Sequence, residues 1–134
     1  MSDSGYPLSE GGPQLGVEPR ATYHHIVLRG DLDSLAAEPI RRRLEELVEA
    51  GGHGRLVLDL AECSFVDSAG LGSLVAVYKR CHARGGPDAA VVLLHASPDF
   101  LELLQLTQLA PHLPCFDSVV EAQRRYPWIG GAGA

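Results

Sequence analysis

Six consecutive residues combine an acid, a hydroxyl and two glycines in an order that could support chemistry or binding: Asp67-Ser68-Ala69-Gly70-Leu71-Gly72. They follow an apolar run typical of a strand and open a run with helical periodicity. In open α/β sheets, such loops at the carboxyl ends of strands carry the functional groups. A helix N-terminus presents free N–H groups and a partial positive charge, so it would stabilise a phosphate on Ser68. The segment therefore suggests a modification and contact site.

The same residues also have a purely structural interpretation. Taken alone, Asp67 and Ser68 are first of all N-cap residues of a helix. A glycine inside a helix costs up to ~1 kcal/mol relative to alanine, so two glycines in one turn need a reason. Gly70 and Gly72 could allow either the close approach of a partner or close packing of the helix on the sheet. The residues alone leave both explanations open.

Patterns for catalysis and for metal or cofactor binding are absent from the sequence. The nucleophile-elbow pattern G-x-S-x-G fails because Val66 stands at its first glycine, and there is no P-loop or GxGxxG motif. The six histidines show no ligand spacing with carboxylates or thiols. Three cysteines (Cys63, Cys81 and Cys115) form no CxxC pair, which favours buried free thiols in a reducing compartment. We therefore expect no catalytic residues, no metal and no cofactor.

Composition limits the class of protein further. The chain has 134 residues, 46% of them hydrophobic, which suits one domain with a substantial core. A net charge of −6 argues against direct binding to nucleic acid, which needs clustered Lys and Arg. No apolar run approaches the ~18–20 residues that span a bilayer, and the N-terminus lacks a signal-peptide pattern. We expect a cytoplasmic protein that binds neither nucleic acid nor a membrane.

Strand and helix patterns alternate along most of the chain. Strands are predicted at 22–28, 55–60, 89–94 and 112–116, and helices at 35–50, 68–84, 98–106 and 118–125. The first helix is expected to use Leu35 in its apolar stripe and Asp33 or Ser34 as its cap. Residues 1–20 are predicted as a tail with a short strand near 14–17, residues 21–126 as the domain, and residues 127–134 as a second tail. This alternation predicts a mostly parallel sheet covered by helices.

The stretch Phe65-Val66-Asp67-Ser68-Ala69-Gly70-Leu71-Gly72 resembles the signature of STAS domains, in particular of bacterial anti-sigma factor antagonists. Four further segments resemble the family and lie in the order that the family has. They are Gly30-Asp31-Leu32-Asp33 before the signature, and Tyr78-Lys79-Arg80, Ser97-Pro98 and Leu104-Gln105-Leu106-Thr107 after it. The resemblance covers about 22–125. It implies an α/β fold with a four- or five-stranded mixed sheet and about four helices packed mainly on one face.

The resemblance also implies a binding protein and not an enzyme. In this family, the unphosphorylated antagonist binds an anti-sigma factor that is also a serine kinase, and so releases a sigma factor. Phosphorylation, here expected at Ser68, ends the binding, and a serine phosphatase restores it. The implied partner-facing surface contains Asp33, Asp67, Ser68, Ala69, Gly70, Leu71 and Gly72, with Asp67 orienting the loop or contacting the kinase. The oligomeric state does not follow from the sequence.

The chain departs from the family pattern at three places. Ala69 stands where the family signature has its second hydroxyl, so Ser68 is the only residue of the signature that could accept a phosphate. If the family's phosphorylated residue corresponds to position 69, this antagonist could not be phosphorylated and would be permanently active. Gln108 stands where the family often has glycine, and 86–88 forms a modified turn; both are expected to change loops and not the fold. Ala69 also favours an alternative, a constitutive STAS interaction subunit of a signalling or transport complex. A small nucleotide-binding enzyme is the other alternative, and it would need a phosphate loop that the sequence lacks.

Overall fold

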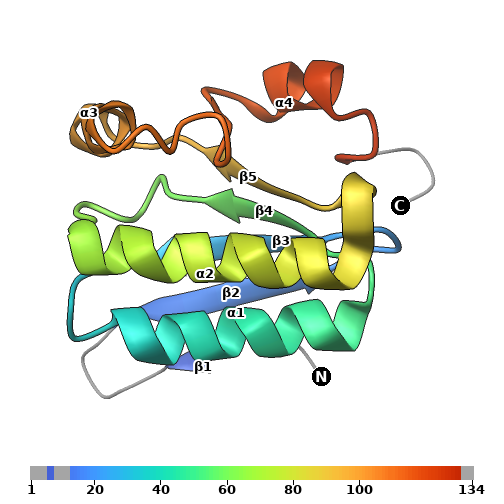
Figure 1. The fold of residues 1–134 in the computed structure, drawn as a ribbon, viewed down its shortest axis with the longest axis horizontal. Helices are drawn as coiled ribbons and strands as arrows, with labels where there is room; N and C mark the ends of the chain where they lie inside the picture. Colours follow the sequence, from blue (N-terminus) through green and yellow to red (C-terminus); the bar gives the residue numbers. More distant parts are fainter. Residues whose placement is uncertain (1–5, 8–12, 131–134) are drawn as a thin grey trace.

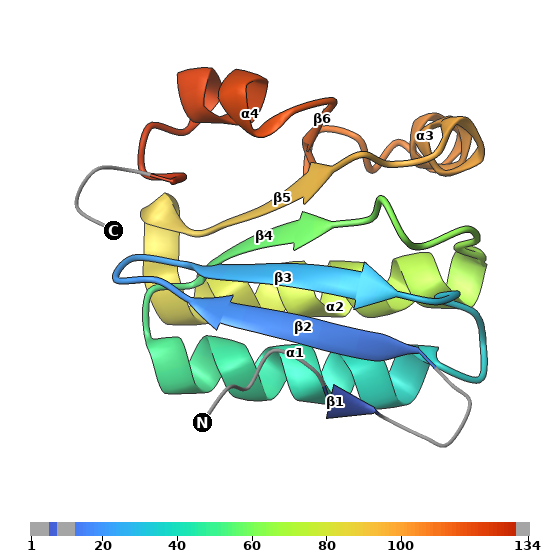
Figure 2. The same ribbon diagram turned by 180° about the vertical axis from the view of Figure 1, so that it is seen from behind.

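The computed structural model describes residues 6–7 and 13–130, which form a mixed six-stranded sheet with the strands in sequence order. β2 pairs with β1 and β3 in antiparallel fashion, whereas β3, β4, β5 and β6 run parallel to one another (Figure 2). The strands are β1 (Tyr6–Pro7), β2 (Gln14–Pro19), β3 (His24–Arg29), β4 (Arg55–Asp59), β5 (Ala90–Leu94) and β6 (Cys115–Phe116). The mixed sheet is confirmed, and the described strands outnumber the expected four or five because β1 joins the edge.

Four α-helices connect or follow the parallel strands: α1 (Ala37–Gly51), α2 (Ser68–Gly85), α3 (Pro98–Leu106) and α4 (Val119–Arg125). α1 and α2 lie side by side across one face of the sheet, and α4 lies on the other side (Figures 1 and 2). A short 3-10 turn, η1 (Gly86–Asp88), follows α2. The predicted placement of the helices mainly on one face is confirmed.

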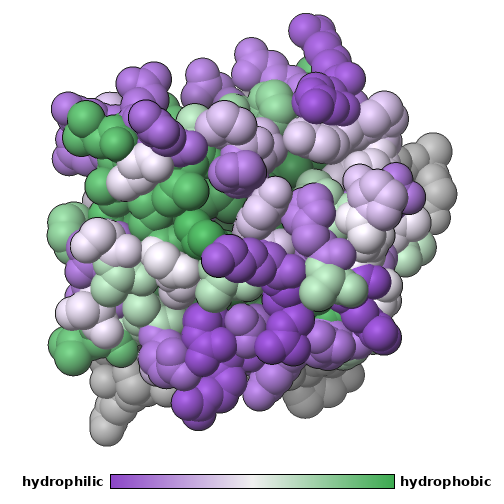
Figure 3. All heavy atoms as spheres, in the orientation of Figure 1, coloured by the Kyte–Doolittle hydropathy of each residue, from purple (hydrophilic) through white to green (hydrophobic). Residues whose placement is uncertain are grey.

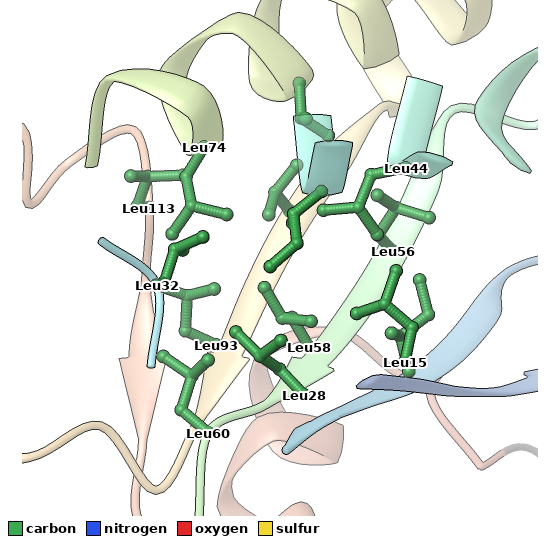
Figure 4. Close-up of a cluster of buried hydrophobic side chains, with 14 of the residues drawn as sticks. Leu15, Leu28, Leu32, Leu44, Leu56, Leu58, Leu60, Leu74, Leu93 and Leu113 are labelled. Atoms are coloured by element: carbon green, nitrogen blue, oxygen red, sulfur yellow. The ribbon is translucent and has the colours of Figure 1, made fainter. Parts of the chain in front are cut away.

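Leucines from both layers fill the space between the sheet and the helices α1 and α2 (Figure 4). Side chains two positions apart enter this core from β2 (Leu15 and Val17) and from β3 (Ile26 and Leu28), as the alternation of strand side chains requires. β5 differs because all five of its residues are buried, as expected for a central strand covered on both faces. Each fully buried leucine contributes about 1.5–3 kcal/mol of hydrophobic stabilisation. The labelled core leucines are Leu15, Leu28, Leu32, Leu44, Leu56, Leu58, Leu60, Leu74, Leu93 and Leu113.

The structure corrects the two predicted tails. The short strand expected near 14–17 is present as the longer β2, Gln14–Pro19, which pairs along its whole length with β3, so this part of the N-terminal segment belongs to the sheet and not to a tail. At the other end, Ile129 is 1% exposed, and the ring of Trp128 lies 5.4 Å from that of Tyr23. Residues 127–130 therefore complete the second, smaller core instead of leaving the domain. The rest of both predicted tails, residues 1–5, 8–12 and 131–134, lies outside the described residues.

The first helix also begins later than predicted, at Ala37 and not at position 35. Pro39 explains the difference, because proline lacks an N–H group and fits only in the first turn of a helix. Leu35 consequently lies before the helix and is 87% exposed, so its assignment to the apolar stripe was wrong. Gln108 adopts φ 61°, the left-handed conformation that favours the glycine expected there.

The described residues contain no helix that is both long and apolar enough to cross a membrane.

The three cysteines are free thiols, two of them buried. Burial raises the pKa of the Cys81 thiol to about 12 and that of Cys115 to about 11. Both side chains therefore remain uncharged and act as small apolar groups.

Two histidines meet at the edge of the sheet where β3 and β4 begin. His24 is 7% exposed, and its ring lies 5.1 Å from that of His53. His53 Nδ1 accepts a hydrogen bond of 3.1 Å from the Arg55 N–H. Burial lowers the pKa of both histidines, and the nearby Arg43 lowers the pKa of His24 further. Both rings therefore favour their neutral form in the folded chain.

This pair predicts that the free energy of unfolding falls in mild acid. Unfolded histidine titrates near pH 6.5, above the folded pKa, so the unfolded chain binds more protons in between. The stabilisation that comes from keeping the two histidines neutral is fully present above about pH 6.5, and it is lost as the pH falls toward their lowered pKa values. Urea unfolding at pH 7.5 and pH 5.5 measures the difference. His24→Gln should reduce this difference, because it removes the buried neutral ring; an unchanged difference in His24→Gln contradicts this account.

Candidate functional site

Two loops meet at the carboxyl ends of β3 and β4, at the left end of the molecule in Figure 1. One leads from β3 to α1 and the other from β4 to α2. The Leu32 N–H donates to the carbonyl of Phe65 (2.8 Å), and the Asp67 N–H donates to the carbonyl of Leu32 (3.3 Å). Leu32 and Val66 also form an isolated parallel bridge. The two loops therefore form one hydrogen-bonded unit.

The carboxylate of Asp67 connects this unit to α2. Asp67 is the N-cap of α2, with an extended backbone. Its Oδ1 accepts from the Gly70 N–H at 2.8 Å, as capping residues do. Its Oδ2 accepts from the Ser34 N–H at 3.1 Å, across to the other loop. Both oxygens thus hold backbone groups of this chain.

Asp33 has a similar structural role before α1. Its Oδ1 accepts from the N–H groups of Leu35 and Ala36, each at 3.1 Å. Its carbonyl accepts from Ala36 and Ala37. The prediction that Asp33 or Ser34 caps the helix is wrong, because the N-cap of α1 is Ala36 and no side chain caps it. Asp33 instead closes a turn immediately before α1. This turn fixes the backbone on both sides of Leu35.

The two glycines of the segment 67–72 have different environments. A Cβ on Gly70 would lie 2.1 Å from the carbonyl oxygen of Leu32, so this position needs glycine for close packing of α2 on the loop. A Cβ on Gly72 would meet nothing within 4 Å, and this residue is exposed. Gly70 is therefore needed for close packing inside the chain. Gly72 has no such role, and its lack of a side chain leaves space above the first turn of α2 for another molecule.

The structure brings all seven predicted site residues to this edge but divides them by exposure. Ser68, Ala69 and Gly72 are exposed, Asp33 and Asp67 are half-buried, and Gly70 and Leu71 are buried, Leu71 with 3% exposure. Gly70 and Leu71 were expected on the partner-facing surface; they instead support that surface from below. The exposed part of the site is small and uncharged.

Two exposed apolar residues of these loops escaped the sequence analysis. Leu35 is 87% exposed and Phe65 is 52% exposed. The exposure of Leu35 could have been predicted from Pro39, because proline fits only in the first turn of a helix and the helix must therefore begin after position 35. Phe65 had no comparable signal, because a phenylalanine beside a strand is usually buried.

No cluster of three or more His, Cys, Asp or Glu side chains able to hold a metal occurs among the residues that the structure describes. A pocket of about 250 Å³ lies between α3, β6 and α4, and none of the predicted site residues contributes to it. Its lining residues are Ala96, Leu101, Cys115, Phe116, Asp117 and Glu121.

The fold and site define a small α/β domain with an exposed serine at the start of a helix that is anchored to two loops. A family model described as the STAS domain matches residues 18–122, so the chain belongs to the STAS domain family. A Paenibacillus polymyxa protein named anti-sigma F factor antagonist is 30% identical over 97 residues, which are 72% of this chain and 80% of the relative. The expected family is thereby confirmed.

Two solved structures share this fold. One is the anti-sigma factor antagonist SpoIIAA in its unphosphorylated form, with 24% identity and a TM-score of 0.65 over 86% of this chain and 99% of the other. The second is the Bacillus cell fate determinant SpoIIAA in the phosphorylated form. It has 25% identity and a TM-score of 0.63, over 84% of this chain and 98% of that one.

The glycines provide a matched pair of stability tests. Gly70→Ala should lower the free energy of unfolding by about 1–3 kcal/mol, because the new methyl group would collide with a carbonyl that already holds the Asp67 N–H. Gly72→Ala should raise it by up to about 1 kcal/mol, because alanine favours the helix and has open space. Denaturant unfolding measures both. Equal effects of the two substitutions would show that Gly70 does not hold the loop against α2.

Proposed function

We propose that the chain is an anti-sigma factor antagonist whose unphosphorylated form binds an anti-sigma factor serine kinase. Phosphorylation of Ser68 ends this binding, and a serine phosphatase reverses the modification. The chain acts by binding and not by catalysis. The observation that carries the proposal is the exposed Ser68 at the first position of α2, in a surface held in place by Asp67.

The position of Ser68 supports a phosphate switch. The Asp67 side chain binds the Gly70 N–H, whereas the first N–H groups of α2, at Ser68 and Ala69, have no intrahelical partner because of their position. A phosphate on Ser68 would be stabilised by these groups and by the helix dipole. It would add about −1.5 to −2 charges to an exposed centre formed by the uncharged residues Ser68, Ala69 and Gly72. A partner that covers this surface would have to desolvate the phosphate, so phosphorylation opposes binding.

The relatives support the same mechanism. The Paenibacillus polymyxa relative carries the name of an anti-sigma F factor antagonist, and SpoIIAA is known in unphosphorylated and phosphorylated forms. In this chain Ala69 leaves Ser68 as the only hydroxyl of the segment 67–72. Ala69 also favours the second candidate, a constitutive interaction subunit that uses the same surface without phosphorylation.

Substitution of Ser68 tests the switch. Ser68→Asp should weaken binding to the anti-sigma factor kinase roughly 30-fold or more, since an unpaired charge buried in an interface costs about 2–5 kcal/mol. Ser68→Ala should bind within about threefold of the wild type, because it adds no charge. Titration calorimetry with the purified kinase measures both constants. Undiminished binding by Ser68→Asp would exclude Ser68 as the switch and favour the constitutive subunit.

A further inference from the structure

We infer that Leu35 and Phe65, on the two loops that meet beside Ser68, are apolar anchors, and that they select a partner with an apolar, uncharged contact surface. This inference rests on the proposed function and names the chemistry of the partner surface. The partner would be the anti-sigma factor kinase itself, and its complementary region would offer apolar side chains in place of a basic patch.

Both anchors are presented by fixed backbone. The Leu35 N–H donates to Asp33 Oδ1, and the Phe65 carbonyl accepts from the Leu32 N–H. Their side chains are 87% and 52% exposed, although leucine and phenylalanine are usually buried. Because the loops are already ordered, a partner would lose little conformational entropy of this chain on binding them. Large apolar residues on rigid backbone are typical anchors of protein interfaces.

The charges of the site explain why an apolar partner fits better than a basic one. Asp67 uses both of its oxygens on backbone N–H groups, and Asp33 uses one oxygen on two of them. These carboxylates are half-buried, and three of their four oxygens already accept backbone N–H groups, so they offer an incoming Lys or Arg fewer acceptors than free carboxylates would. The nearby Glu62 is paired with Arg29 at 3.2 Å, and exposed Asp31 belongs to the rim of the site. The centre is formed by the neutral residues Ser68, Ala69 and Gly72.

The molecular surface agrees with this division. Figure 3 shows apolar residues gathered on the left side of the molecule, between α2 and α3, and hydrophilic residues over α1. α3 contributes two exposed leucines, Leu101 and Leu106, with 37% and 75% exposure. α1 instead carries a network of ion pairs, such as Arg41 with Glu45. An apolar partner therefore finds its complementary area at the end where α2 begins.

The test measures the affinity of full-length variants for the kinase from the same genome that binds the wild-type chain in titrations of purified proteins. Leu35→Ser and Phe65→Ser should each weaken binding about tenfold or more, because truncation of a large apolar anchor in an interface has effects of this size. Val120→Ser is the matched control. Val120 is 57% exposed on α4, beyond the other face of the sheet, so its substitution should change binding less than twofold.

A second measurement avoids substitutions altogether. Hydroxyl-radical footprinting of the wild-type chain, alone and with the kinase, should show at least about threefold lower oxidation of Leu35 and Phe65 in the complex, with Val120 unchanged. If Leu35→Ser and Phe65→Ser both bind with wild-type affinity, and the kinase does not protect Leu35 or Phe65 from oxidation, the two residues are not anchors. The proposed function still holds in that case if Ser68→Asp loses binding. If no anti-sigma factor kinase binds the wild-type chain, the proposed function itself fails. A stable dimer of the free chain with both residues protected would overturn the inference by making this surface a homodimer interface.

Discussion

The Asp67 carboxylate is the contact on which the site depends. One of its oxygens caps α2 through the Gly70 N–H, and the other holds the Ser34 N–H of the neighbouring loop. These two bonds fix the start of α2 relative to the loop before α1, and therefore fix where Ser68 is presented. Gly70 completes the arrangement, because only a residue without Cβ lets α2 approach the Leu32 carbonyl. A short acidic residue and a glycine three positions later thus define both the helix start and the surface proposed to contact the partner.

The parallel part of the sheet explains why these loops meet. β3 and β4 are paired in parallel, so their carboxyl ends, and the helices that follow, lie at the same edge. The apolar core beneath α1 and α2 holds this edge in place, with Leu71 and Leu74 anchoring the first turns of α2. The exposed centre of this surface, formed by Ser68, Ala69 and Gly72, is small and carries no charged side chain. Such a surface can be covered by an apolar partner at little cost, and a single phosphate makes the same covering unfavourable.

Much of this could be predicted from the sequence because local signals and tertiary packing agree. Helical periodicity after Asp67 placed α2, and the apolar run at 89–94 located the doubly covered central strand β5. The chain ends were harder, since the strand character of β2 depends on pairing with β3 and the burial of Ile129 depends on the core around Tyr23. The exposure of Leu35 and the internal role of Gly70 depend on contacts between separate loops, which periodicity does not encode. The hydroxyl at Ser68 was visible in the sequence, but its surroundings were not.

The most direct test of the account is phosphate mapping coupled to binding. The chain is incubated with the anti-sigma factor kinase proposed as its partner and with ATP. The modified residue is located by mass spectrometry, and the affinity of the purified phosphorylated and unmodified forms is compared. The account predicts one phosphate, on Ser68, and loss of binding by the phosphorylated form. Phosphate on another residue, or binding that survives phosphorylation of Ser68, would contradict it.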